Sequence, residues 1–312
     1  MTYRTYRSFA APLLGAVGLS LAAPVLAQQT DPGNDIVVEG ERTDRREVLR
    51  TTRDITQRPG SDSEPVPRFQ REICPGVWGL APDNAQLVID RIYDNAERAG
   101  IAINEEEGCG ANIWVIVVDD PAATYAQLRE ENEFLVQDLS DLDKRLVERQ
   151  EGPVRAWNIT STRNREGQAI ASGADVAATM ALSRSGSVGE PNNPVSQMSR
   201  LHSAVRLDLE MSVMLIQRSA IGEVDAFALA DYATMRLLAH TEPPERENVS
   251  DTVLTLFSPD AEPGQPDRLT AFDRGYLRAV YDSTATRPYR LALRNVRRNM
   301  ERELQMEIEA EQ

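Results

Sequence analysis

The sequence predicts an α+β fold in which a mixed sheet packs against several helices in a single main domain. Apolar residues recur at helical spacing in several segments that end at Gly or Pro. Residues 113–118 and 201–217 instead show the apolar run and the alternation that are typical of strands. Because these helices and strands do not alternate strictly along the chain, the pattern favours α+β over a regular βαβ fold.

The first 27 residues have the features of a secretory signal peptide. Arg4 and Arg7 precede a long apolar run, and Val25-Leu26-Ala27 places small side chains before a polar segment. We therefore expect cleavage between Ala27 and Gln28, and a periplasmic or secreted location in a Gram-negative envelope. An uncleaved signal anchor is the alternative. No later stretch is apolar enough to predict a transmembrane helix.

The charge limits the possible partners. The formal net charge of the whole chain is −15, and loss of the signal peptide with its two arginines makes it more negative. Such an acidic protein is not expected to bind nucleic acid or an anionic bilayer through its overall field.

Residues 28–65 are expected to form a disordered, acidic or polar tail or linker, because they contain few large apolar side chains. One island within it, Asp35-Ile-Val-Val-Glu-Gly-Glu-Arg42, resembles a string near the mature N-terminus of TonB-dependent outer-membrane receptors. That resemblance implies a part in TonB-linked envelope traffic. The other interpretation is a short β-prone patch within a tail.

The main domain is expected to span residues 66–285. It begins with an extended segment at 67–73 and a turn at Cys74-Pro75-Gly76. A helix is predicted from Pro82 to Gly100, because apolar residues recur at helical spacing and glycine is a common terminator. The apolar run at 113–118 is rich in β-branched residues, which favours a strand buried on both faces.

The next segments mix helices and strands. Acidic helices are predicted at 122–133 and 140–150, and a strand at 154–163. Residues 163–200 are rich in Gly, Ser, Asn and Pro and are expected to be a long excursion, whose order and role stay open. Alternation over 201–217 predicts one long strand or a hairpin.

The remainder is mainly helical. Glu223–His240 is a predicted helix that stops before Thr-Glu-Pro-Pro, and 269–281 is predicted as an amphipathic helix after a short apolar segment at 252–257. Residues 286–312 are predicted to form a long amphipathic C-terminal helix. Its apolar stripe is flanked by a basic face formed by Arg290, Arg294, Arg297, Arg298 and Arg302.

Two interpretations of this C-terminal helix remain open. It docks on the core and pairs charges on its solvent face, or it binds a partner or a second copy of itself. A possible envelope protein partner would bind through this helix or through the N-terminal tail.

Cys74 and Cys109 are the only cysteines, so in an oxidising compartment they are expected to form a disulfide. Closing a loop of about 35 residues contributes roughly 3–4 kcal/mol in the chain-entropy model. A redox pair is the alternative, but the chain has no C-x-x-C motif.

The sequence supports no catalytic, metal-binding or cofactor-binding residue, and we expect no cofactor. Neither His202 nor His240 has another ligand in register, and His240 falls in the last turn of a helix, where a cation is favoured. We expect Asp231 to point outward from that helix. The run Glu105-Glu106-Glu107 is expected to be a solvated loop, with a weak calcium site as the alternative.

Several strings resemble segments of uncharacterised exported alphaproteobacterial proteins, a family that implies no function: Ile73–Leu80, the strand after Cys109, Leu229–Arg236 and Leu269–Tyr281. The last pattern, following a central helix, also resembles secreted zincin-like domains of unknown function. The helix Glu223–His240 lacks the histidine ligands of such a domain, so this resemblance implies a fold kept without its metal.

These observations predict an exported, non-catalytic interaction or structural protein of the envelope. The alternative is a degenerate or atypical zincin-like hydrolase with a site around Asp231 and His240. The spacing of these two residues puts them on opposite sides of a helix, which argues against a shared cleft.

Overall fold

The computed structural model describes residues 44–57, 64–168, 170, 199, 201–222, 224–245, 251–258 and 264–310. The expected signal peptide with its cleavage point at Ala27 and Gln28 lies outside these ranges, as do the TonB-receptor-like island and most of residues 163–200. None of the helices in the described ranges is long and apolar enough to cross a membrane.

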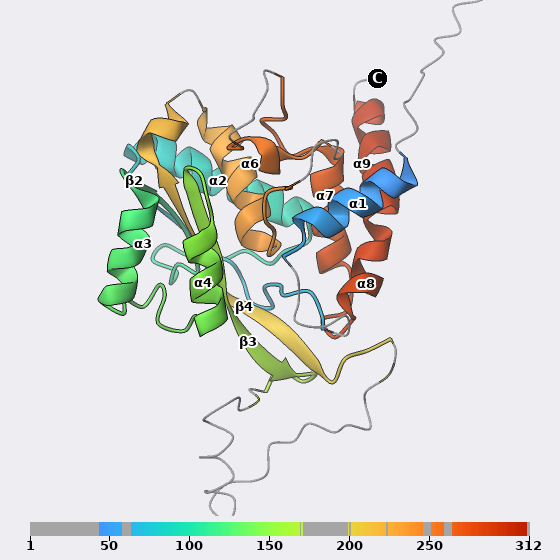
Figure 1. Cartoon of the computed structure of the whole chain (residues 1–312). Helices are drawn as coiled ribbons and strands as arrows, with labels where there is room; N and C mark the ends of the chain where they lie inside the picture. Colours follow the sequence, from blue (N-terminus) through green and yellow to red (C-terminus); the bar gives the residue numbers. More distant parts are fainter. Residues whose placement is uncertain are drawn as a thin grey trace, which may run out of the picture. The chain divides into compact units, whose positions relative to one another are not determined.

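A four-stranded mixed sheet organises the domain, which confirms the predicted α+β fold (Figure 1). Its strands lie in the order β1-β2-β4-β3. β1 is parallel to β2 and β2 to β4, whereas β3 is antiparallel to β4. The strands are β1 (Pro75–Trp78), β2 (Ile113–Val118), β3 (Val154–Asn164) and β4 (Val205–Gln217).

The helices of the described ranges follow in chain order, with short 3₁₀ turns between some of them. They are α1 (Arg45–Ile55), α2 (Pro82–Arg98), α3 (Pro121–Glu130), α4 (Asp141–Arg149), η2 (Arg218–Ile221), α6 (Ala226–Leu238), η3 (Val253–Thr255), α7 (Ala271–Tyr281), α8 (Tyr289–Ala292), η4 (Leu293–Asn295) and α9 (Val296–Ala310). Side-chain caps from Asp120, Ser140, Asp225 and Thr270 begin α3, α4, α6 and α7.

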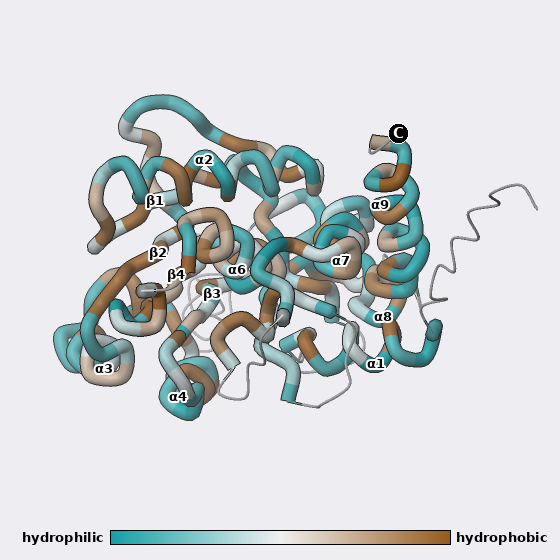
Figure 2. The backbone as a smooth tube through the Cα atoms, turned by 90° about the horizontal axis from the view of Figure 1, so that it is seen from above, coloured by the Kyte–Doolittle hydropathy of each residue, from teal (hydrophilic) through white to brown (hydrophobic). Residues whose placement is uncertain are grey.

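Both faces of the sheet are covered. Because successive side chains of a strand point to opposite faces, Ile113 and Val115 enter a core with α2 and α6, while Trp114 and Ile116 pack against a second cluster. That second cluster is built with α3 and α4 on the other side of the strands (Figure 2). The predicted burial of β2 on both faces is therefore confirmed, although its second face is only half-buried.

The C-terminal helices form the other end of the domain. α7 and α9 approach so closely that a Cβ atom at Gly275 would lie 2.6 Å from the backbone nitrogen of Met300. Glu303, buried on α9, pairs with Arg274 and Arg278 of α7. α1 also packs against α9 and crosses it in Figure 1.

Two local predictions were wrong. Residues 44–57, which we assigned to a disordered tail, contain α1; Asp44 caps this helix, and its Val48 and Ile55 side chains are fully buried. The turn expected at Cys74-Pro75-Gly76 instead begins β1, because its backbone pairs in register with β2. For the segment 201–217 a strand or a hairpin was open; its residues 205–217 form the single strand β4.

Candidate anion-binding groove

A cavity of about 710 Å³ lies between α1 and the start of the C-terminal helical segment. Its lining combines apolar and hydroxyl side chains with arginines and contains no acidic residue. The lining residues are Arg45, Val48, Leu49, Thr52, Arg53, Thr56, Tyr289, Arg290, Leu291, Leu293, Arg294, Val296 and Arg297. We call this cavity the arginine groove.

One wall of the groove is a stripe along α1. Arg45, Leu49 and Arg53 follow one another at intervals of one helical turn, so their side chains share a face. Leu49 is half-buried and both arginines are exposed, whereas Val48 beside them is fully buried. The same helix therefore anchors itself in the core and presents its cationic side to the groove.

The opposite wall comes from α8, η4 and the first turn of α9. Arg290, Arg294 and Arg297 recur at helical spacing and are exposed, while Leu293 and Val296 are buried beneath them. This wall is the basic face that the sequence predicted for the C-terminal helix. Its apolar side docks on the domain, and its arginines face a second basic helix.

Only some of the arginines in the groove pair with carboxylates. Arg297 pairs with Glu301 on the next turn of α9. Within the part of the chain that the structure describes, no carboxylate pairs with Arg45, Arg53 or Arg294. On the C-terminal wall, Arg290, Arg294 and Arg297 lie one helical turn apart, and like charges at this spacing destabilise a helix by a few tenths of a kcal/mol per pair. An anion between the two walls would relieve this repulsion.

The side chain of Asp231 lies in the core, so the outward orientation that we expected is wrong. Its side chain is fully buried and accepts four hydrogen bonds. Arg91 of α2 donates two of them, at 2.7 and 2.9 Å, Asn95 donates one at 2.7 Å, and the Leu269 backbone N–H donates one at 3.0 Å. The hydrogen bond to Asp231 raises the pKa of Arg91.

His240 also differs from its expected role as a cation at a helix end. It lies beyond the last residue of α6, in the left-handed backbone region with φ of 47°. Its Nδ1 is 3.0 Å from the side-chain oxygen of Asn158. Burial lowers the pKa of His240 to about 4, so the ring is neutral at pH 7.

The other candidate residues lie apart from the groove. His202 forms an isolated bridge with Ser199, and the Glu105-Glu106-Glu107 run is exposed, as a solvated loop would be. Among the described side chains, no group of three or more His, Cys, Asp or Glu residues could hold a metal ion.

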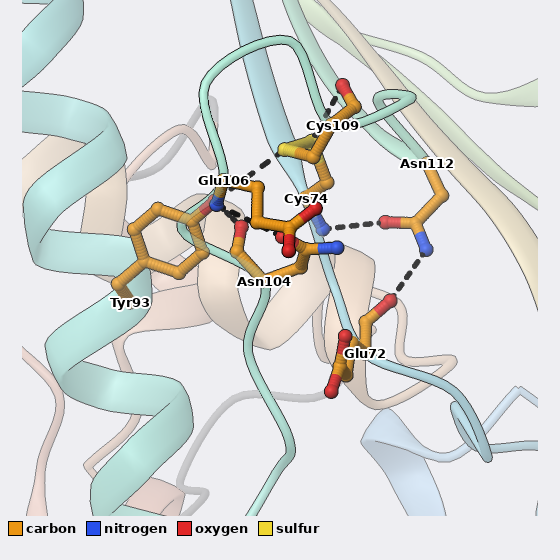
Figure 3. The surroundings of a disulfide bond; sticks show 7 residues. All are labelled: Glu72, Cys74, Tyr93, Asn104, Glu106, Cys109 and Asn112. Carbon is orange, nitrogen blue, oxygen red and sulfur yellow. Dashed lines mark hydrogen bonds between the residues drawn. A yellow bond between two sulfur atoms is a disulfide. The ribbon is translucent and has the colours of Figure 1, made fainter.

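Cys74 and Cys109 lie at disulfide distance, with their sulfur atoms 2.01 Å apart, as the sequence predicts (Figure 3). The bridge ties the start of β1 to the loop between α2 and β2. Asn112 supports it, because its side-chain oxygen accepts from the Cys74 N–H at 2.8 Å and its amide donates to the Glu72 carbonyl (Figure 3). The disulfide therefore links the edge strand β1 to the loop that precedes β2.

No protein-family model, curated protein or solved structure matches this chain. The groove must therefore be interpreted from its own chemistry. The sequence predicted the basic face of the C-terminal helix but missed α1, which completes the groove. The available signal was Asp44 in a capping position, followed by Val48, Thr52 and Ile55 at helical spacing.

Proposed function

We propose that this is an exported envelope protein that acts by binding rather than by catalysis, and that the arginine groove binds its ligand, an anion. The observation that carries the proposal is a cavity lined by five arginines and no acidic residue in a chain whose net charge is −15. The signal-peptide pattern and the paired cysteines support export.

Arginine suits such a site for physical reasons. Its planar guanidinium donates two parallel hydrogen bonds to one carboxylate or phosphate, and it stays charged at any physiological pH. Arg45 and Arg53 approach from one wall and Arg294 from the other, so an anion in the groove can be held from both sides. The half-buried Leu49 and Leu291 offer apolar contact next to these charges.

The zincin-like hydrolase stays a prediction that we do not advance further. Its candidate residues have other roles here: Asp231 joins α2 to α6 and to Leu269, two residues before α7, and His240 bonds to Asn158 of β3.

The test uses an anionic fluorescent probe, 8-anilinonaphthalene-1-sulfonate, titrated into the purified protein. We expect a saturable site that the double substitution Arg53→Gln with Arg294→Gln weakens by about tenfold or more, because charge-assisted hydrogen bonds are lost. The matched control is Arg145→Gln with Arg149→Gln on α4, which removes the same charge away from the groove. Equal weakening by both pairs, or by neither, contradicts the proposal.

A further inference from the structure

The groove has the size of a small-molecule site. Ligand cavities commonly measure roughly 300–1,000 Å³, and the arginine groove, at about 710 Å³, falls in that range. A protein partner of ordinary affinity would instead need a contact of roughly 800 Å² on each side. The cavity therefore fits a compact ligand that enters between the helices better than a protein surface laid across them.

The lining contains two kinds of surface, exposed arginines and apolar side chains. Its rims are the exposed arginines, with Arg45 and Arg53 separated by about 12 Å along the axis of α1. Between and beneath them run the apolar side chains, with Leu49 between the two arginines on one wall and Leu293 and Val296 under the other. A small hydrophilic anion would pair with the arginines but leave the half-buried Leu49 and Leu291 in contact with water.

We infer that the ligand is an amphiphile with one apolar chain and an anionic headgroup, either a carboxylate or a phosphate. This inference rests on the proposed function and specifies its ligand class. The headgroup takes bidentate hydrogen bonds from the unpaired arginines, and the chain lies along the strip formed by Leu49, Leu291 and Leu293. Charge complementarity supports this occupant, because all charged residues that line the groove are arginines while the chain as a whole is strongly acidic.

Both parts of the ligand are needed in this arrangement. Without the chain, exposed guanidinium groups hold an anion only weakly, because water and salt screen the attraction. Without the headgroup, Arg45, Arg53 and Arg294 gain no anionic partner and a neutral chain gains only apolar contact. Affinity should therefore depend on chain length and charge together.

The experiment is displacement of the bound probe, followed by calorimetric titration, with saturated carboxylates of six to sixteen carbons kept below their micellar concentrations. We expect affinity to rise about fourfold for each added methylene until the groove is filled, and then to level off. Dodecyl phosphate distinguishes the two headgroups, and binding of either one supports the inference. Acetate, inorganic phosphate and dodecanol should each bind at least about a hundredfold more weakly than the best amphiphile.

Two variants separate the contributions of the two surfaces. Replacing Arg45, Arg53 and Arg294 together by Gln should remove the preference for dodecanoate over dodecanol. Leu49→Asn should flatten the chain-length series while acetate binding stays unchanged. All four side chains are exposed or half-buried, so we expect both proteins to fold, with unfolding curves as the check.

The outcomes also separate this inference from the proposed function. If the probe binds in an arginine-dependent manner but chain length has no effect, or dodecanol binds as well as dodecanoate, the amphiphile is refuted and the anion-binding function stands. If neither the probe nor any amphiphile binds in an arginine-dependent manner, both are refuted.

Discussion

Gly275→Ala should destabilise the protein, although alanine is the better helix former. Gly275 lies within α7, where a Cβ atom would be 2.6 Å from the Met300 nitrogen, 2.9 Å from the Met300 Cα and 3.0 Å from the Val296 carbonyl oxygen. All three are backbone atoms of α9, so no rotation of a side chain can make room. Helix α9 would have to move away from α7.

The magnitude follows from two opposing effects. Overpacking a buried contact typically costs about 1–3 kcal/mol, and replacing glycine by alanine within a helix returns about 1 kcal/mol. The difference between the two effects is a net loss of about 0–2 kcal/mol in the free energy of unfolding. We expect about 1–2 kcal/mol, because the new methyl group meets rigid backbone. Since α9 carries Arg297 and Val296, the shift should also weaken probe binding in the arginine groove.

The assay is urea unfolding followed by circular dichroism, with Gly110→Ala as the control. At Gly110 a Cβ atom would meet no other atom within 4 Å, so that substitution should change stability by less than about 0.5 kcal/mol. If Gly275→Ala is as stable as the wild-type protein or more stable, α7 and α9 do not approach as closely at Gly275 as described.

Three further predictions concern the core and the disulfide. Replacing Cys74 and Cys109 together by Ala should lower the free energy of unfolding by roughly 3–4 kcal/mol, measured by urea unfolding; an unchanged value would show that no bridge forms. The ring resonances of His240 should titrate near pH 4 by NMR rather than near 6.5. Because its folded-state pKa is lowered, its contribution to stability is present above about pH 6.5 and is lost as the pH falls towards 4. A midpoint near 6.5 would contradict its burial. Asp231→Asn should cost about 1.5–3 kcal/mol in thermal or urea unfolding through weaker bonds from Arg91, and a loss below about 0.5 kcal/mol would exclude the buried ion pair.

The elements that sequence patterns predicted best are those whose signals are local. The strand at 113–118 coincides with β2, and the helix that begins at Pro82 coincides with the start of α2. In both cases composition and periodicity within a few residues define the element. The extent of Glu223–His240 was overestimated, because a helix end depends on backbone conformation, and His240 adopts left-handed φ beyond α6.

The two wrong predictions, for α1 and for Asp231, have the same cause: both features depend on contacts between residues that are distant in the sequence. The sequence of α1 predicts a polar tail, because charged residues dominate its composition. The helix buries only Val48, Thr51, Thr52 and Ile55. Its packing against α9, which is distant in sequence, is what stabilises it. Asp231 was expected to face solvent on helical spacing alone. On α6, however, every residue from Ala228 to Leu238 is buried, so no solvent face exists there, and Arg91 of α2 supplies the missing charge.

The charges of the C-terminal helical segment are paired differently along its length, in a way that fits the proposed binding function. Further along α9, the buried Glu303 pairs with Arg274 and Arg278 of α7. At the start of this segment, Arg294 instead faces a helix that also presents arginines, Arg45 and Arg53, although this acidic chain has many carboxylates that could have served there. If the proposed function holds, an anion bound between these walls would stabilise the folded protein by mass action.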